Sequence, residues 1–206
     1  MEYLSKEEES RPWTPMQPSE VYSILKEVKA PWWIAGGWAI EFFVGENYRT
    51  HSGLDLLILR EDQLKFQNAF SDWEIFASDP PGQLRLWNKD ETLPQISHDI
   101  WLRKDSSSNW ALQFMLMDSI DDSCLFRRDN SISLPRDEIS MKTEDNLPFL
   151  CPHFQLLYNS KSLRDKDLLD FQKSLPLLNQ EQKIWLLEKL KYVYNNNHPW
   201  INELVK

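Results

Sequence analysis

The stretch that decides the fold of this chain is Trp32-Trp33-Ile34-Ala35-Gly36-Gly37-Trp38-Ala39-Ile40-Glu41. Residues 32–35 form a short apolar run, which predicts a buried strand, and residues 37–44 predict a helix that ends at Gly45. Glycine is used where the backbone needs a positive φ or where a second group approaches closely. A strand that passes through Gly36 and Gly37 into a helix presents backbone N–H groups, and such groups suit phosphate. The alternative is a tight strand-to-helix turn that holds no ligand.

A second strand follows in Arg49-Thr50-His51-Ser52-Gly53-Leu54-Asp55-Leu56-Leu57-Ile58-Leu59-Arg60. Residues 54–59 are apolar except for Asp55, and a buried carboxylate is costly unless it has a partner. Asp55 therefore needs either a network of hydrogen-bond donors or a metal ion, and Mg²⁺ prefers carboxylate ligands. Together with the glycine pair, this carboxylate suggests a site for a nucleoside triphosphate.

Asp99 is the other carboxylate in strand-like surroundings, in His98-Asp99-Ile100-Trp101. If its strand lies beside that of Asp55, both side chains can reach one Mg²⁺ ion. A carboxylate not committed to the metal could instead accept the proton of an attacking hydroxyl. The competing interpretation is that Asp55 binds a backbone group and Asp99 merely ends a strand.

A charged cluster lies between Lys161 and Phe171, where basic and acidic residues alternate around an apolar anchor. Lys161 or Lys166 could reach a triphosphate across a cleft. The alternative is a solvated helix face with weak ion pairs.

Four histidines are spread along the chain without a metal-binding spacing such as HExxH. His51 and His98 each lie close in sequence to a candidate carboxylate. They are either hydrogen-bond donors to the site or packed structural residues.

The remaining pattern predicts an α/β (α+β) protein. Residues 1–17 read as a flexible N-terminal arm, 18–146 as the α/β domain and 147–206 as a C-terminal helical part. We expect helices over 18–30, 61–71 and 180–194 and at two places between 152 and 171. Strands are expected over 73–76, 83–87, 98–102, 110–117 and 124–127.

Composition restricts the class of partner. The net charge of −9 argues against non-specific binding to nucleic acid or anionic membrane and suits a cationic small molecule. The apolar run over 31–44 is too short to span a bilayer, and the start of the sequence is charged. Cys124 and Cys151 form no CxxC pair, which suits free thiols in a reducing compartment. We therefore expect a cytoplasmic protein, either a monomer or a homodimer.

The residues quoted above resemble the nucleotidyltransferases of the DNA polymerase β superfamily, in particular the aminoglycoside and lincosamide adenylyltransferase-like branch. The resemblance runs in order through residues 30–200, from the Gly36-Gly37 turn through Arg49, Asp55 and Asp99 to the segment 161–171. It implies the nucleotidyltransferase fold, a mixed β-sheet flanked by helices, with the C-terminal helical part closing the cleft. It further implies a nucleotidyltransferase that transfers AMP from Mg²⁺-bound ATP to a hydroxyl of a small molecule. It also implies that Gly36, Gly37, Arg49, Lys161 and Lys166 bind the nucleotide and that Asp55 and Asp99 are catalytic and bind metal.

One departure from the family pattern affects the metal site. The resemblance places an Asp-x-Asp motif on the second strand, and its first position is Gly53 in this chain. Glycine supplies no side-chain ligand, so we expect weaker metal binding and slower transfer. Glu41 or Glu46 could replace the missing ligand. The resemblance also leaves open a nucleotide- or metabolite-binding protein without transfer, or an interaction module.

Overall fold

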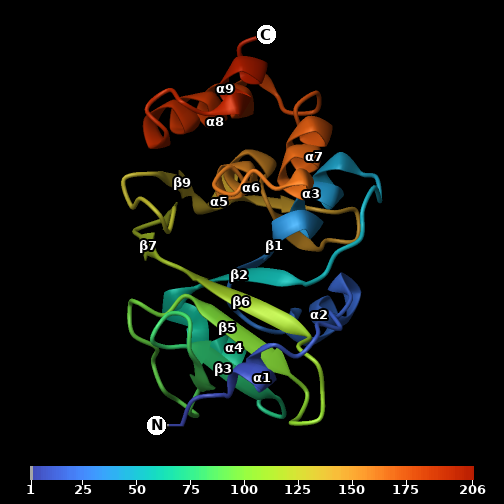
Figure 1. Cartoon of the computed structure of the whole chain (residues 1–206), viewed down its shortest axis with the longest axis vertical. Helices are drawn as coiled ribbons and strands as arrows, with labels where there is room; N and C mark the ends of the chain where they lie inside the picture. The colour runs from blue at the N-terminus through green and yellow to red at the C-terminus, as the bar shows by residue number, and fades with distance from the viewer. Residues whose placement is uncertain (1) are drawn as a thin grey trace.

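The computed structural model describes residues 2–206 and contains a large mixed sheet (Figure 1). The strands of this sheet follow the order β10-β11-β1-β2-β6-β5-β3-β4. Two neighbouring pairs, β1 with β11 and β2 with β6, are parallel, and the others are antiparallel. The bounds are β1 Trp32–Ala35, β2 Asp55–Leu59, β3 Glu74–Ser78, β4 Leu84–Leu86, β5 Asp99–Arg103, β6 Leu112–Met117, β10 Ser140–Lys142 and β11 Pro148–Leu150. A smaller antiparallel sheet contains β7 Ser119–Ile120, β8 Ser123–Leu125 and β9 Ser133–Pro135.

Helices flank the sheet, and those from the C-terminal part gather at one end of the molecule, which is the top of Figure 1. There α3 contacts α6 and α7, and α8 contacts α6 and α9. The helix bounds are α1 Lys6–Glu9, α2 Pro18–Leu25, α3 Gly36–Val44, α4 Gln63–Ala69, α5 Arg136–Ile139, α6 Pro152–Asn159, α7 Asp165–Ser174, α8 Gln180–Val193 and α9 Pro199–Leu204, with a 3-10 turn over Arg60–Asp62.

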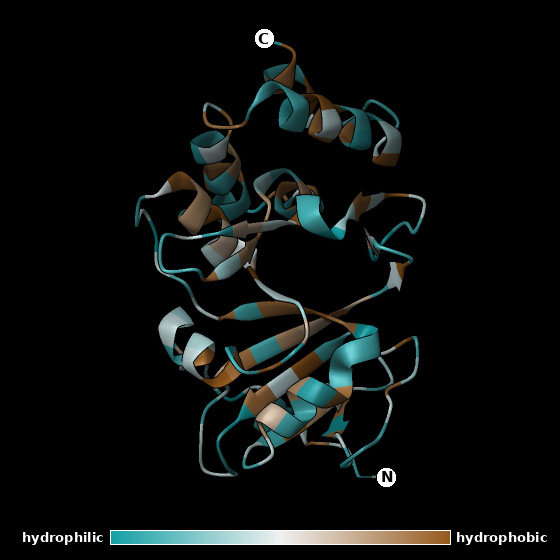
Figure 2. Cartoon of the chain, turned by 180° about the vertical axis from the view of Figure 1, so that it is seen from behind, coloured by the Kyte–Doolittle hydropathy of each residue, from teal (hydrophilic) through white to brown (hydrophobic). Residues whose placement is uncertain are grey.

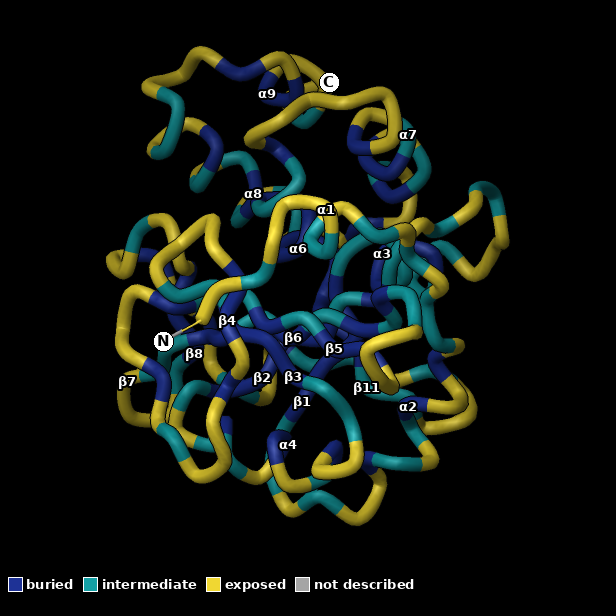
Figure 3. Tube along the Cα trace, turned by 60° about the horizontal axis from the view of Figure 1, so that its bottom comes forward, coloured by how far each residue is buried: buried dark blue, intermediate teal, exposed yellow. Residues whose placement is uncertain are grey.

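The two faces of β2 and β6 have different surroundings. Side chains alternate between the faces of a strand, so Leu56 and its partner Phe114 lie on one face, where Phe66 of α4 meets Phe114 edge-on. Asp55, Leu57 and their partners lie on the opposite face, toward a cavity. Figure 2 shows apolar segments running through the strands, and Figure 3 shows these strands buried beneath exposed loops. Buried apolar residues therefore lie on both faces of the sheet, and Asp55 is a carboxyl group on the face that also carries Leu57.

Local sequence explains where several helices begin and end. Pro18 occupies the first turn of α2, and Gln17 and Glu20 form a capping box there. Gly45 adopts a left-handed conformation and ends α3. The predicted helix over 18–30 is too long, because the chain leaves the helix after Leu25 and Val28 N–H turns back to the Leu25 carbonyl.

The segment over residues 2–17, predicted as a flexible arm, lies along the sheet in this structure. It contains α1, and two isolated β-bridges join it to the sheet, one between Tyr3 and Arg85 and one between Trp13 and Trp110. Thr14 N–H donates to the Trp110 carbonyl at 2.8 Å and Met16 N–H donates to the Ala111 carbonyl at 3.0 Å. These bonds bring Trp13 to the edge of the second cavity described below.

The mixed sheet flanked by helices is confirmed, as is the strand over 32–35. The sequence interpretation missed α5, α9 and the short strands β7, β9, β10 and β11. The sheet consequently extends into the predicted helical part, because β11 pairs with β1 at Ile34 and Phe149. Within residues 2–206, none of the helices combines the length and apolar character that crossing a membrane requires.

Candidate active site

The turn from β1 into α3 lies close to the side chains of Asp55 and Arg49. Gly36 has φ +65°, and a Cβ atom there would lie 2.6 Å from Asp55 Oδ2. A Cβ atom at Gly37 would lie 1.8 Å from Arg49 Nη2. Both distances are too short for a Cβ atom, so a side chain at either position would push the Asp55 carboxylate or the Arg49 guanidinium aside. The glycine pair thus brings the start of α3 against an acidic and a basic side chain.

Asp55 stands at the first position of β2, opposite Ala35 at the end of β1. Burial raises the pKa of its carboxyl to about 6, while the charge of Lys166 lowers it and that of Asp99 raises it. A carboxyl with this pKa exchanges protons close to neutral pH. Asp55 is therefore suited to accept a proton.

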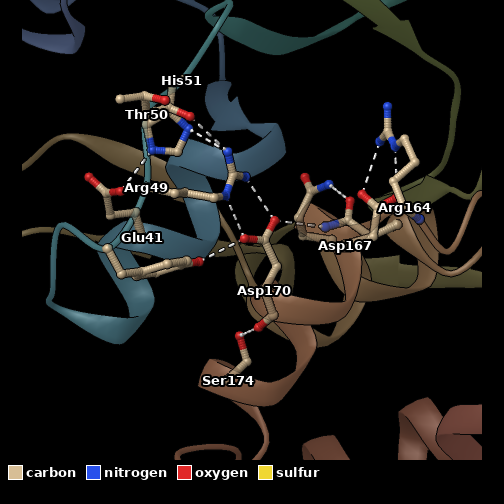
Figure 4. A network of polar contacts seen from close by, with 11 residues as sticks. Glu41, Arg49, Thr50, His51, Arg164, Asp167, Asp170 and Ser174 are labelled. Atoms are coloured by element: carbon tan, nitrogen blue, oxygen red, sulfur yellow. Dashed lines mark hydrogen bonds and ion pairs between the residues drawn. The ribbon is translucent and has the colours of Figure 1, made fainter.

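Arg49 connects the loop after α3 to helix α7. Its Nε and Nη2 atoms donate to the two carboxylate oxygens of Asp170, each at 2.8 Å (Figure 4). Tyr48 adds a hydroxyl hydrogen bond to the same carboxylate at 2.8 Å. Asp170 is buried, and Ser174 donates to its backbone carbonyl. This bidentate pair fixes the guanidinium beside Gly37.

His51 holds Arg49 from the other side, as Figure 4 shows. Arg49 Nη1 lies 3.2 Å from His51 Nδ1, and His51 Nε2 lies 2.8 Å from Glu41 Oε2. A guanidinium only donates, so Nδ1 accepts and the remaining N–H of His51 donates to Glu41. His98, by contrast, lies 3.1 Å from Arg60 Nη2. Among the predicted histidines, His51 is the one that contacts a candidate site residue.

Helix α6 supplies two amide side chains that the sequence interpretation missed. Gln155 Oε1 accepts from the Gly36 N–H at 2.8 Å, and Gln155 Nε2 donates to Asn159 Oδ1 at 2.8 Å. The Gly36 N–H is therefore already satisfied within the protein. Two amides one turn apart on the otherwise apolar sequence of α6 were the signal that could have identified them.

The charged residues before and along α7 make different contacts. Arg164 forms a bidentate pair with the buried Asp167, at 2.8 and 2.9 Å, which also caps the helix. Lys166 lines the space near Asp55 and influences its pKa. Lys161 is exposed and lines neither of the two cavities that these residues surround, which are introduced below. Of the two lysines predicted to bind nucleotide, the structure brings only Lys166 to this region.

These groups surround a first cavity of about 210 Å³ between the sheet and helices α3, α6 and α7. Its walls carry five basic and three acidic side chains, and two of those acids are paired with Arg49 and Arg164. Arg127 and Arg128, which follow β8, were not predicted as site residues. The charged lining consists of Arg49, Arg127, Arg128, Arg164, Lys166, Asp55, Asp167 and Asp170. Such a surplus of positive charge suits an anion.

A second cavity of about 530 Å³ adjoins the first. Gly37, Arg49, Asp55 and Lys166 line both cavities. Asp55 therefore stands in the wall that separates the two spaces.

Asp99 stands on β5, which β6 separates from β2, so the strands of Asp55 and Asp99 are not neighbours. The charge of Asp99 nevertheless raises the pKa of Asp55. Asp99 accepts from Gln113 Nε2 of β6 at 3.1 Å and pairs with Arg127 at 3.3 Å. The assumption of neighbouring strands is wrong, and the Asp99 carboxylate already has two partners.

The donor set does not fit a metal ion held by the protein. No three His, Cys, Asp or Glu side chains in the described part of the chain come together as metal ligands. Gly53 offers no side-chain donor, Glu41 contacts His51, and Glu46 pairs with Lys173. Of the three carboxylates that line the first cavity, Asp167 and Asp170 pair with arginines, which leaves Asp55. Mg²⁺ keeps one or two carboxylates only when phosphate oxygens complete its shell.

Comparison with known proteins relates this geometry to a family. The model of the aminoglycoside-2''-adenylyltransferase family matches residues 19–116. This range contains the glycine turn, Arg49, Asp55 and Asp99 but not α6 or α7. No curated protein matches the chain in sequence.

Solved structures share the fold. A lincomycin-bound lincosamide antibiotic adenylyltransferase, LnuA, is 15% identical, with a TM-score of 0.51 over 84% of this chain and 97% of that chain. The enzyme ANT(2")-Ia in complex with adenylyl-2"-tobramycin is 12% identical, with a TM-score of 0.55 over 86% of this chain and 98% of that chain. The chain thus has the nucleotidyltransferase fold along most of its length.

Proposed function

We propose that this protein is an adenylyltransferase-like nucleotidyltransferase that binds a nucleoside triphosphate such as ATP in the first cavity. The observation that carries the proposal is the combination of a glycine turn with a surplus of basic side chains around one cavity. Arg49 and Lys166 come from separate segments and face the same space. Cationic groups of this kind stabilise the charge of a triphosphate.

The proposed reaction transfers AMP to a hydroxyl group of a small molecule. The hydroxyl oxygen attacks the α-phosphorus, pyrophosphate leaves, and Asp55 accepts the hydroxyl proton. A pKa of about 6 makes Asp55 mostly ionised at neutral pH and still able to bind a proton. Because the donor set does not build a metal site, the basic side chains supply the charge neutralisation in this scheme.

A second candidate is a protein that binds the nucleotide without transferring AMP. Gly53 favours it, since the resemblance to the family implies an aspartate at this position and a glycine offers no side-chain ligand for a metal ion. Loss of one charge-stabilising group costs roughly two to three orders of magnitude in rate. Both candidate functions include binding of the nucleotide, and they differ only in whether AMP is then transferred to form a product.

Calorimetric titration with ATP tests the nucleotide, and two lysine variants make the test specific. Lys166 lines the cavity, whereas Lys161 is an exposed lysine five residues earlier that lies outside it. We expect Lys166→Met to weaken ATP binding about tenfold, while Lys161→Met leaves it unchanged. Absence of ATP binding to the wild type, with or without Mg²⁺, would overturn both candidates.

Product analysis then separates the candidates. Release of pyrophosphate from ATP in the presence of hydroxylated acceptors supports the transferase, and Asp55→Asn should abolish it. ATP binding without pyrophosphate release from any acceptor supports the binding protein instead.

A further inference from the structure

The second cavity has walls of a different chemical character from the first. Apart from the residues that the two cavities share, it is lined by Trp13, Pro15, His51, Ser52, Gly53, Trp101 and Gln113. These residues come from the N-terminal segment, from the loop before β2, and from β5 and β6. Aromatic rings and small polar groups thus replace the arginines of the first cavity.

Two indole rings form a fixed apolar surface in this cavity. The rings of Trp13 and Trp101 meet edge-to-face, with centroids 5.2 Å apart. Both also contact the buried ring of Trp110, at 6.4 and 5.3 Å. The backbone bonds of Thr14 and Met16 hold Trp13 in this position. At an interplanar angle of 71° the two rings form an apolar corner, in which the flat face of a ligand can stack on one ring and its edge can meet the other.

The charge of the second cavity is close to balanced. Asp55 is the one carboxylate among its lining residues and faces Lys166, while Arg49 is neutralised by Asp170. A polycationic ligand needs several carboxylates to replace its lost hydration, and this wall does not offer them. A neutral ligand needs only hydrogen-bonding groups, which Ser52 and Gln113 provide.

We propose that the second cavity binds the acceptor, a neutral hydroxylated molecule with a flat apolar face, seated on Trp13 and Trp101. Its hydroxyl group lies beside Asp55, the side chain that also borders the first cavity. This assignment rests on the proposed function only where it names the ligand as an acceptor. Polycationic aminosugars are excluded by the charge of the wall.

The test measures binding to the full chain without nucleotide, with p-nitrophenyl β-D-glucopyranoside as the neutral probe and tobramycin as the polycationic one. We expect the glucoside to bind at least about tenfold more tightly than tobramycin. Trp13→Ala should weaken glucoside binding about tenfold, whereas Trp13→Phe should preserve it within about threefold because it keeps an aromatic face. Trp73→Ala serves as the control, because Trp73 is not one of the described residues that line the first or the second cavity.

A charge variant tests the exclusion of polycations. Ser52 is exposed and lines the second cavity, so Ser52→Asp adds a carboxylate to its wall. We expect this variant to bind tobramycin about fivefold more tightly than the wild type. Circular dichroism confirms that each variant is folded.

Three results would overturn the assignment: no binding of the glucoside, tighter binding of tobramycin to the wild type, or unchanged glucoside affinity in a folded Trp13→Ala variant. Failure of the proposed function looks different. If ATP does not bind while the glucoside binds through Trp13, the second cavity remains a ligand site and only the name acceptor is lost.

Discussion

Arg49 and Asp170 form a bidentate ion pair with both N···O distances at 2.8 Å, and it joins the loop after α3 to helix α7. The side chains are 14% and 1% exposed, so the pair is shielded from water. Removing one partner of a buried pair leaves the other charge without compensation.

We therefore expect Asp170→Ala to lower the free energy of unfolding by about 3–5 kcal/mol, measured by urea denaturation. The pair Lys173–Glu46 joins the same two segments at 3.0 Å but is exposed. Lys173→Ala should consequently cost less than about 1 kcal/mol. Equal losses in the two variants would contradict the importance of burial.

Close approach at the glycine turn predicts a difference between two glycine substitutions. Gly36 and Gly45 both have positive φ, at 65° and 75°, but a Cβ atom would clash with Asp55 only at Gly36. Gly45→Ala should cost roughly 1–2 kcal/mol for backbone strain. Gly36→Ala should cost clearly more in thermal or urea unfolding. Similar costs would mean that Asp55 moves aside freely.

The raised pKa of Asp55 predicts how stability depends on pH. The carboxyl has a pKa of about 6 in the folded protein against an ordinary value of 3.8, so the folded state holds the proton more tightly than the unfolded chain does. Stability from this group therefore falls as pH rises from about 4 to about 6. The difference in free energy of unfolding between Asp55→Asn and the wild type should therefore favour the variant by on the order of 1–3 kcal/mol more at pH 8 than at pH 4. Urea unfolding at both pH values measures this, with the exposed Asp72→Asn as the control for lost charge.

Space at Gly53 predicts that an aspartate can be introduced there. The nearest atom to an added Cβ is Trp13 Cε3 at 4.0 Å, and the added carboxylate would stand two residues before Asp55. We expect Gly53→Asp to fold normally and to make ATP affinity dependent on Mg²⁺ by about tenfold or more. Calorimetry with and without Mg²⁺ checks this. Ser52→Asp adds the same charge one residue away, and an equal effect in both variants would refute a specific ligand position.

The local part of the site could be predicted because its signals are contiguous. Residues 32–37 combine an apolar run with the rare glycine pair, and the strand prediction for 32–35 agrees with β1. Asp55 was recognisable because a carboxylate interrupts a run of apolar residues. These are short-range patterns, and the backbone follows them closely.

The remaining site residues depend on contacts that sequence spacing does not reveal. Gln155 meets Gly36 across 119 residues, and Asn159 meets Asp170 across a helix boundary. The position of Asp99 was misjudged for a related reason, because strand order depends on the insertion of β6 between β2 and β5. Three-residue strands such as β11 are too short to show alternation and were missed.

The ion pair between Arg49 and Asp170 also restricts the motion of helix α7 relative to the glycine turn. Swinging α7 away from the glycine turn would break both hydrogen bonds of this pair, so the pair favours the arrangement in which α7 stays beside the turn. Any widening of the first cavity on this side must therefore begin with the separation of Arg49 from Asp170.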